Sequence, residues 1–221
     1  MNSPSFACCF VFLSVIFCFC TKISLADSDN LQDTCPTSPL AKQTIFINGF
    51  LCKNPNDISS SDFKTTRLTQ PGDTDNFSGS AVTIVTAAEF PGLNTLGLSI
   101  ARTDFRVDGL VRLHSHPRAT EMFFVSKGLV LVGFIDTSNE PFGTFLKEGD
   151  VFVFPRGLLH FCLNPGYGTA TGLSVYNSQN PGVVTMADAM FEPTPDVIKK
   201  LTKGFVTGLL RNATLSGISS F

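Results

Sequence analysis

The stretches His-Ser-His-Pro-Arg-Ala-Thr-Glu at residues 114–121 and Phe-Pro-Arg-Gly-Leu-Leu-His-Phe at residues 154–161 contain all three histidines of the chain. His114 and His116 stand at i and i+2, which places both imidazoles on one face of a β-strand. Taken alone, such a pair is also compatible with two structural histidines. The remaining residues of the two stretches decide between these interpretations.

Glu121 and His160 complete a set of metal-binding side chains. A tight connection after His116 would fold the Glu121 carboxylate back toward the first two imidazoles, and the strand and turn before His160 could direct the third imidazole into the same cavity. Three neutral imidazoles and one carboxylate suit a divalent transition metal such as Mn, Fe, Ni, Cu or Zn. Octahedral coordination would leave positions open for water, a dioxygen species or a bidentate anion.

Short apolar segments surround these stretches from Ala81 to about Val184. Runs of β-branched or aromatic residues alternate there with turn signals, a pattern typical of an antiparallel barrel or sandwich. The runs cover residues 82–86, 95–105, 110–116, 121–125, 129–135, 151–155, 160–164 and 169–176. We therefore expect an all-β barrel domain over residues 81–184.

The segments on either side of this domain differ from it. Residues 27–80 are mostly polar and are interpreted as an N-terminal arm. Thr194, Pro195 and Asp196 form a helix-start pattern, so residues 185–221 are expected to form short apolar helices. These helices would pack either on the chain's own barrel or on a neighbouring subunit.

Residues 1–26 are interpreted as a secretory signal peptide. An uncharged apolar run from Phe6 to Cys20 precedes Ser-Leu-Ala at residues 24–26, whose small residues suit cleavage after Ala26. A retained membrane anchor is the alternative, but a run of about 15 residues is shorter than the ~20 that a spanning helix needs. We expect a secreted protein with no membrane segment after cleavage.

The cysteines that remain after cleavage are Cys35, Cys52 and Cys162. A disulfide between Cys35 and Cys52 would enclose a short loop and stabilise the arm by about 3 kcal/mol. Cys162 shares a strand face with His160, and it is interpreted either as a buried thiol or as a soft metal ligand.

Composition excludes several functional classes. The 221 residues are 43% hydrophobic and 15% charged, which argues against disorder over most of the chain. A formal net charge of -2 without a basic run gives no electrostatic reason to expect nucleic acid or anionic lipid as a partner. The sequons at Asn76 and Asn212 are candidate glycosylation sites on an exported chain.

The spacing of the two histidine stretches resembles the paired motifs of the cupin superfamily. The first motif reads His-x-His-x4-Glu-x6-Gly from His114 to Gly128, and the second reads Gly-x5-Pro-x-Gly-x2-His-x3-Asn from Gly149 to Asn164. The residues of both stretches are similar to those of plant germins and germin-like proteins. Further germin-like landmarks occur in order at residues 31–35, 48–52, 76–78 and 176–182.

This resemblance implies a cupin jelly-roll β-barrel with one manganese ion per subunit and a disulfide between Cys35 and Cys52. The implied manganese ligands are His114, His116, Glu121 and His160. It also implies an apoplastic glycoprotein of the cell wall that assembles as a hexamer, a trimer of dimers. Dismutation of superoxide to hydrogen peroxide is the leading hypothesis, in line with the family's association with plant defence. The expected small-molecule partner is superoxide or another small anion.

Two departures from the germin pattern bear on the substrate. Germins with oxalate oxidase activity carry asparagines at positions that correspond here to Ala101 and Val111. A directed hydrogen bond to a charged group is worth about 1.5–3 kcal/mol, so oxalate oxidase activity is disfavoured. A third hypothesis, of a different class, is a non-enzymatic, metal-stabilised wall or receptor-type binding protein.

Three polar residues near the motifs have simpler interpretations. Arg118 and Arg156 are expected to be solvated turn residues, although both could attract an anion. Asn164 is expected to tie down the end of its strand.

Overall fold

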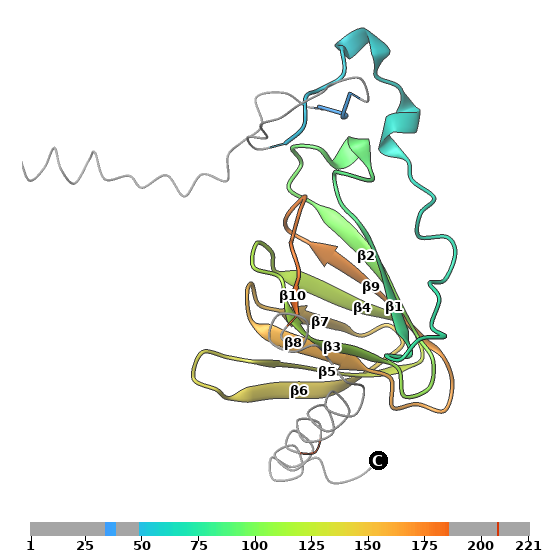
Figure 1. Cartoon of the computed structure of the whole chain (residues 1–221), viewed down its shortest axis with the longest axis vertical. Helices are drawn as coiled ribbons and strands as arrows, with labels where there is room; N and C mark the ends of the chain where they lie inside the picture. The colour runs from blue at the N-terminus through green and yellow to red at the C-terminus, as the bar shows by residue number, and fades with distance from the viewer. Residues whose placement is uncertain (1–33, 39–48, 186–206, 208–221) are drawn as a thin grey trace, which may run out of the picture. The chain divides into compact units, whose positions relative to one another are not determined.

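Two antiparallel β-sheets make up most of the part of the chain that the structure, a computed structural model, describes: residues 34–38, 49–185 and 207. The first sheet has the strand order β1-β2-β9-β4-β7, and the second has the order β10-β3-β8-β5-β6. Figure 1 shows the two sheets facing each other. This arrangement confirms the all-β fold that the apolar runs predict.

The strands are short and lie between Ser80 and Thr185. The first sheet consists of β1 (Ser80–Val85), β2 (Ser99–Phe105), β9 (Ala170–Tyr176), β4 (Glu121–Lys127) and β7 (Val151–Phe154). The second consists of β10 (Val184–Thr185), β3 (Leu110–Ser115), β8 (Leu159–Leu163), β5 (Leu129–Ile135) and β6 (Pro141–Lys147). The described 3₁₀-helices are η1 (Pro55–Asp57), η2 (Ser60–Phe63) and η3 (Pro91–Leu93).

The chain crosses from one sheet to the other at most of its connections. Among the described strands, β1 with β2 and β5 with β6 are the consecutive strands that pair within one sheet. Strands far apart in the sequence therefore become neighbours, as β4 and β9 do. This path is typical of a jelly roll, and it brings together β3, β4 and β8, which contain or directly precede the predicted metal ligands.

The hydrophobic core lies between the sheets and receives side chains from both. In β4, the buried Phe123 and Val125 alternate with the exposed Met122 and Phe124, as the strand period of two requires. Burying a side chain such as Phe123 contributes about 1.5–3 kcal/mol. The other core residues are Phe105, Val130, Val132, Leu146, Phe154, Cys162 and Ala170.

Strand β6 is the main element that the apolar pattern did not predict. It is the edge strand of the second sheet and pairs with β5, and Leu146 is its only buried residue. Pro141 and Gly143 interrupt its apolar residues, which suits an edge position better than a central one. Residues 95–98 were expected to be part of a strand, but they form a turn before β2.

A disulfide and a buried asparagine organise the described part of the N-terminal arm. Cys35 and Cys52 form the predicted disulfide. The Asn94 side chain, which is fully buried, donates from Nδ2 to the carbonyl oxygens of Cys35 and Phe50 at 2.9 and 2.8 Å. Its Oδ1 accepts from the backbone N–H of Phe50 at 2.9 Å. The arm is thereby fixed to the turn that precedes β2.

Three predictions concern residues outside the described ranges. These are the signal peptide at residues 1–26, glycosylation at Asn212, and the helices of residues 185–221, of which Thr185 and the helical Thr207 are described. None of the helices in the described ranges is long and apolar enough to cross a membrane.

Candidate metal centre

A bulge in β3 positions the first histidine. Val111 pairs with Cys162 of β8. The next paired residue of β3, His114, faces His160, so three steps along β3 match two steps along β8. The extra residue changes the alternation, and therefore Val111 and His114 both line the cavity between the sheets. His116 follows directly after the last residue of β3.

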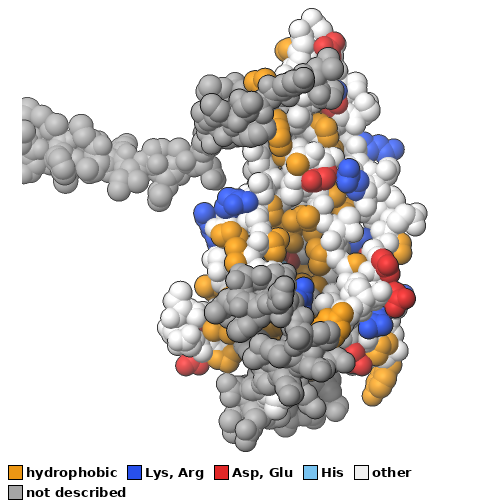
Figure 2. All heavy atoms as spheres, viewed as in Figure 1, with side chains coloured by type: hydrophobic (Ala, Val, Ile, Leu, Met, Phe, Trp, Pro, Cys, Tyr) orange, Lys and Arg blue, Asp and Glu red, His pale blue; other side chains and the backbone are white. Residues whose placement is uncertain are grey.

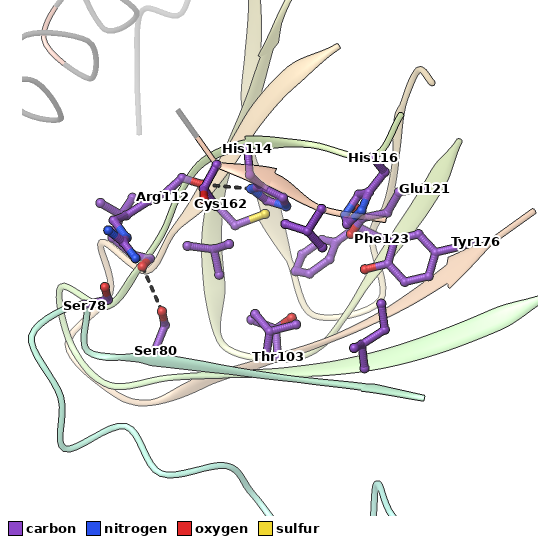
Figure 3. Close-up of a pocket in the computed structure, with 16 residues that line it drawn as sticks. Ser78, Ser80, Thr103, Arg112, His114, His116, Glu121, Phe123, Cys162 and Tyr176 are labelled. Atoms are coloured by element: carbon purple, nitrogen blue, oxygen red, sulfur yellow. Dashed lines mark hydrogen bonds and ion pairs between the residues drawn. The ribbon is translucent and has the colours of Figure 1, made fainter. Parts of the chain in front are cut away.

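The structure brings the four predicted metal ligands together, from both sheets. The ligand atoms of His114, His116, Glu121 and His160 all lie within 4.8 Å of one another. Glu121 opens β4 in the first sheet, whereas His114 and His160 belong to β3 and β8 in the second, and His116 follows directly after β3. The Nε2 atoms of His116 and His160 each lie 3.2 Å from Oε2 of Glu121. Figure 3 shows two of these imidazoles and the carboxylate directed into one cavity.

Backbone carbonyl groups hold all three imidazoles in the same tautomer. The pairs of Nδ1 and carbonyl oxygen are His114 with Arg112, His116 with Gly182 and His160 with Leu158. A carbonyl oxygen can only accept a hydrogen bond, so each Nδ1 carries a proton, and in a neutral imidazole Nε2 then presents its lone pair. A hydrogen bond of this kind on the second nitrogen is typical of metal-binding histidines.

The unpaired lone pairs fit a metal ion. Nε2 of His116 is buried and has no hydrogen-bond partner among the described residues, although it faces the carboxylate of Glu121. An imidazole lone pair and a carboxylate oxygen can both only accept, so a cation between them is needed for an attraction. The 3.2 Å separations are short enough for the nitrogen and oxygen atoms to bind one shared ion.

Ser174 of β9 holds the other oxygen of Glu121. Its buried hydroxyl donates to Oε1 at 2.6 Å, which leaves Oε2 on the side of the imidazoles. Burial opposes ionisation of Glu121, but hydrogen bonding to the carboxylate, including the bond from Ser174, outweighs it and holds the pKa of the carboxyl below its usual range. Glu121 is therefore an anion at neutral pH.

His114 stays neutral over a wide pH range. Burial and the neighbouring His160 lower the pKa of His114 to about 3. The neutral imidazole is the form that binds a metal ion. This ligand is therefore available without competition from protons in mildly acidic solution.

The metal centre lies at one end of a cavity of about 320 Å³. In Figure 3, His116, Glu121 and Tyr176 lie at this end, and Arg112 and Ser80 lie at the other. Burial and the nearby Glu121 raise the pKa of Tyr176 well above its usual value, so its phenol is protonated. The apolar part of the lining includes Val82, Ile84, Leu110, Val111, Phe123 and Val183.

Comparisons with known proteins agree with this geometry. The family model described as Cupin matches residues 66–205. Germin-like protein subfamily 3 member 4 of Arabidopsis thaliana is 55% identical over 197 residues, which cover 89% of this chain and 93% of the relative. The chain belongs to the germin-like proteins of the cupin family. Germin-like protein 11-1 of Oryza sativa subsp. japonica is 52% identical over 201 residues, which cover 91% of this chain and 89% of that relative.

Solved structures of related proteins have the same fold. A recombinant oxalate oxidase in complex with glycolate is 38% identical, with a TM-score of 0.69, and the match covers 85% of this chain and 98% of the oxidase. Peruvianin-I, a cysteine peptidase from Thevetia peruviana latex, is 40% identical, with a TM-score of 0.68 and coverage of 73% and 99%. The germin-like fold is thus shared by proteins of different activities, so the site must decide the function.

Cys162 of this germin-like chain is a buried free thiol. It lines the cavity, but the group of possible metal ligands found among the described residues does not include it. Burial and the nearby Glu121 raise its pKa well above the usual value. These observations favour the buried-thiol interpretation over the soft-ligand one.

The other polar residues near the motifs stabilise loops. Asn164 is fully buried, and its side chain makes hydrogen bonds to three backbone groups beyond the ends of β2 and β8. Arg118 and Arg156 are exposed, as expected for turn residues. Each also donates from Nε to a backbone carbonyl oxygen, that of Asn180 at 2.7 Å for Arg118 and that of Pro117 at 3.0 Å for Arg156.

Three residues that support the site were not found from the sequence. Ser174 and Tyr176 share the inward face of β9, but their meeting with Glu121 depends on the register between β4 and β9. Gly182 supplies the carbonyl oxygen for His116. Its φ of 67° lies in the left-handed region that favours glycine, and a Cβ there would lie 2.7 Å from Nη2 of Arg118. The sequence signal available for this position was Gly182 itself, followed by the apolar Val183 and Val184.

Proposed function

We propose that this chain is a secreted, manganese-binding germin-like protein that dismutates superoxide and thereby produces hydrogen peroxide for defence in the plant cell wall. The observation that supports this proposal most is the convergence of three imidazoles and one carboxylate within 4.8 Å. This donor set suits a redox-active divalent metal and leaves coordination positions open. No side-chain nucleophile is required.

A bound manganese ion would supply the one-electron chemistry, because it can accept an electron from one superoxide and return it to another. The residues of the chain hold and orient the donors. The three imidazoles keep Nε2 directed inward because Nδ1 is tied to the backbone. The single carboxylate of Glu121 balances only one charge of a divalent ion, so the loaded site keeps a net positive charge that attracts a small anion.

A dismutase assay tests this proposal. The manganese-loaded protein, freed of contaminating dismutase, is expected to exceed the activity of an equal amount of free manganese, and His114→Ala is expected to abolish the excess. A loaded protein no more active than free manganese would refute the proposal, as would an unchanged activity in the variant.

Oxalate oxidase is the less well supported activity, although a solved oxalate oxidase resembles this structure. Ala101 is fully buried in β2 and packs against Tyr176, and Val111 lines the cavity. Neither side chain can donate a hydrogen bond to a dicarboxylate. Peroxide release from oxalate by the manganese-loaded protein would overturn this ranking.

A cysteine peptidase activity, as described for Peruvianin-I, has little support from the described residues. Their free cysteine is Cys162, whose thiol is buried and has a raised pKa. A peptidase nucleophile needs an accessible thiolate, and such cysteines have lowered pKa values. The four cysteines of residues 1–26 lie outside the described ranges.

Metal removal distinguishes an enzyme from a metal-stabilised binding protein. Stripping the metal is expected to leave a folded but inactive protein, because the core between the sheets is formed by side chains other than the predicted metal ligands. If the protein unfolds and loses partner binding on metal removal, the ion has a structural role and the non-enzymatic alternative is favoured.

An apolar patch on the outer face of the first sheet supports assembly into a homo-oligomer. Met122 pairs with Val153 and Val175, and Phe124 pairs with Val151, so the five side chains are neighbours across β4, β7 and β9. Each is 38–52% exposed. Apart from this patch, Figure 2 shows hydrophobic side chains near the middle of the face that it presents. Exposed patches of this kind mark protein interfaces.

The expected assembly is a hexamer, a trimer of dimers. Light scattering after size-exclusion chromatography measures its mass. Val153→Lys, which places a charge within the patch, is expected to reduce the mass of the assembly. A monomeric wild-type protein, or an unchanged mass in the variant, would contradict this use of the patch.

Secretion and glycosylation belong to the same proposal. Asn76 is exposed, and the disulfide between Cys35 and Cys52 is consistent with an oxidising compartment. Mass spectrometry of the native apoplastic protein is expected to find Asp27 as the first residue and a glycan on Asn76. A protein that retains residues 1–26 and is absent from the apoplast would contradict it.

A further inference from the structure

Tyr176 presents a hydroxyl group to the metal end of the cavity. It is the last residue of β9, is 2% exposed and pairs with Glu121 of β4. Its side chain lines the same cavity as His116 and Glu121. In Figure 3 the phenol points into this cavity beside these two residues. The hydroxyl also interacts with Ser174 on the same face of the strand. It is otherwise directed into a space with a mainly apolar lining.

The packing around the ring fixes this orientation. Tyr176 forms a small cluster with the fully buried Ala101 and with Ala119, and Ile84 packs against the cluster. On another side, its ring centroid lies 4.8 Å from that of His116, at an interplanar angle of 67°. The small side chains at positions 101 and 119 leave the room that the ring occupies. The hydroxyl is therefore held in place before any ligand arrives.

The chemistry of the site calls for a donor at this end of the cavity. A divalent ion with one carboxylate ligand keeps a net positive charge, so a small anion is the ligand expected at an open position. A hydrogen-bond donor would stabilise an anion at this position. The side chains of Ala101 and Val111 cannot donate one. Ser80 is at the far end in Figure 3, and its hydroxyl donates to the carbonyl oxygen of Leu110 at 2.8 Å.

We propose that the Tyr176 hydroxyl donates a hydrogen bond to the small anion bound at the metal centre. The inference rests on the proposed function only in assuming that a metal ion is bound and has an open position. Ser174, two residues earlier on the same strand face, cannot take this role, because its proton is directed to Glu121. The Thr103 hydroxyl is not assigned this role either, because Thr103 lies on the opposite wall of the cavity in Figure 3.

Anion binding to the Tyr176→Phe variant tests this role. The exchange removes one oxygen atom and keeps the ring that packs against Ala101. With azide as the probe and manganese-loaded full-length protein, the dissociation constant is expected to rise about 10-fold, the effect of one lost hydrogen bond to a charged ligand. The manganese content is expected to stay the same. An azide affinity within about twofold of the wild type would overturn the proposal, and so would loss of manganese from the variant.

Tyr167→Phe is the matched control. The chain has two tyrosines, and Tyr167 is fully exposed in the loop between β8 and β9, so its azide affinity is expected to equal that of the wild type. Superoxide dismutation is measured separately on the same samples. If no sample dismutates superoxide but the azide difference persists, the proposed activity fails and the role of Tyr176 stands. If dismutation is present and the azide difference is absent, the role of Tyr176 fails alone.

Discussion

Asn94 and His116 are both buried polar side chains, but they differ in how their polar atoms are satisfied. The Asn94 amide makes hydrogen bonds of 2.8–2.9 Å on both Nδ2 and Oδ1 to the backbone of the N-terminal arm. His116 is satisfied at Nδ1 by Gly182, but Nε2 has no hydrogen-bond partner among the described residues.

This difference separates a structural polar group from a functional one. An unsatisfied buried polar atom costs about 1–3 kcal/mol, so a fold retains one only where something else compensates. Around Asn94 the backbone compensates, and the result is a stable link between the arm and the sheets. Around His116 a bound cation would be the compensating partner. Changes around Asn94 are therefore expected to affect stability, and changes around His116 are expected to affect metal binding.

The largest expected effect is on metal binding in the His160→Ala variant. This change removes one of the four donors and leaves Glu121 and the other imidazoles in place. Manganese affinity is expected to fall by more than about 100-fold, since even partners of the ligands alter affinity about 10–100-fold. Elemental analysis after dialysis measures the loss, and circular dichroism checks the fold. A variant that retains a full complement of manganese would show that His160 is not a ligand.

Replacing Asn94 by alanine is expected to affect stability instead. The change removes the side-chain hydrogen bonds to backbone groups of Cys35 and Phe50, so the free energy of unfolding is expected to fall by about 3 kcal/mol. Urea unfolding measures this loss, with the exposed Asn56→Ala as the matched control. Manganese content is expected to be unchanged. Equal stability of the two variants would remove the distinction between the regions.

The cluster of candidate metal ligands could be predicted from the sequence because its spacing reflects local geometry. His114 and His116 are two residues apart at the end of a strand, and the disulfide joins the two cysteines of the arm. The supporting residues could not be found in this way. The contacts of Ser174 with Glu121 and of Gly182 with His116 span more than 50 residues, and they depend on strand register.

The bulge in β3 and the edge strand β6 have the same explanation. A strict alternation would place Val111 and His114 on opposite faces of β3, and the extra residue that changes this leaves no mark in the apolar pattern. The residues of β6 show no regular alternation because an edge strand buries little of either face. Local patterns predict central strands well, but they carry little information on what lies across a sheet.

Ser174→Ala sharpens the comparison from within the metal centre. Ser174 is not one of the predicted ligands, but its hydroxyl orients the carboxylate of Glu121, which is one. Its loss is expected to weaken manganese affinity by about 10-fold. Competition with a chelator measures the affinity. Ser126→Ala serves as a control on β4, because Ser126 bonds to the backbone of Thr171. An affinity equal to that of the control would mean that Ser174 has no part in the site.

The smallest effect is on the pH dependence of stability without metal. The folded-state pKa of His114, about 3, lies below its unfolded value of about 6.5. As the pH falls below about 6.5, the unfolded state takes up a proton that the folded state refuses, so stability decreases, by about 1 kcal/mol per pH unit. Urea unfolding of the metal-free protein between pH 6.5 and 5 measures this slope. His114→Leu is expected to flatten it, and an equal slope in the variant would contradict the lowered pKa.

Anomalous diffraction at the manganese edge, on crystals of native protein purified without added metal, tests the metal centre most directly. The expected result is one peak per chain, bounded by the Nε2 atoms of His114, His116 and His160 and by Oε2 of Glu121. No peak between these atoms, or any of the four side chains turned away from the others, would contradict the assignment.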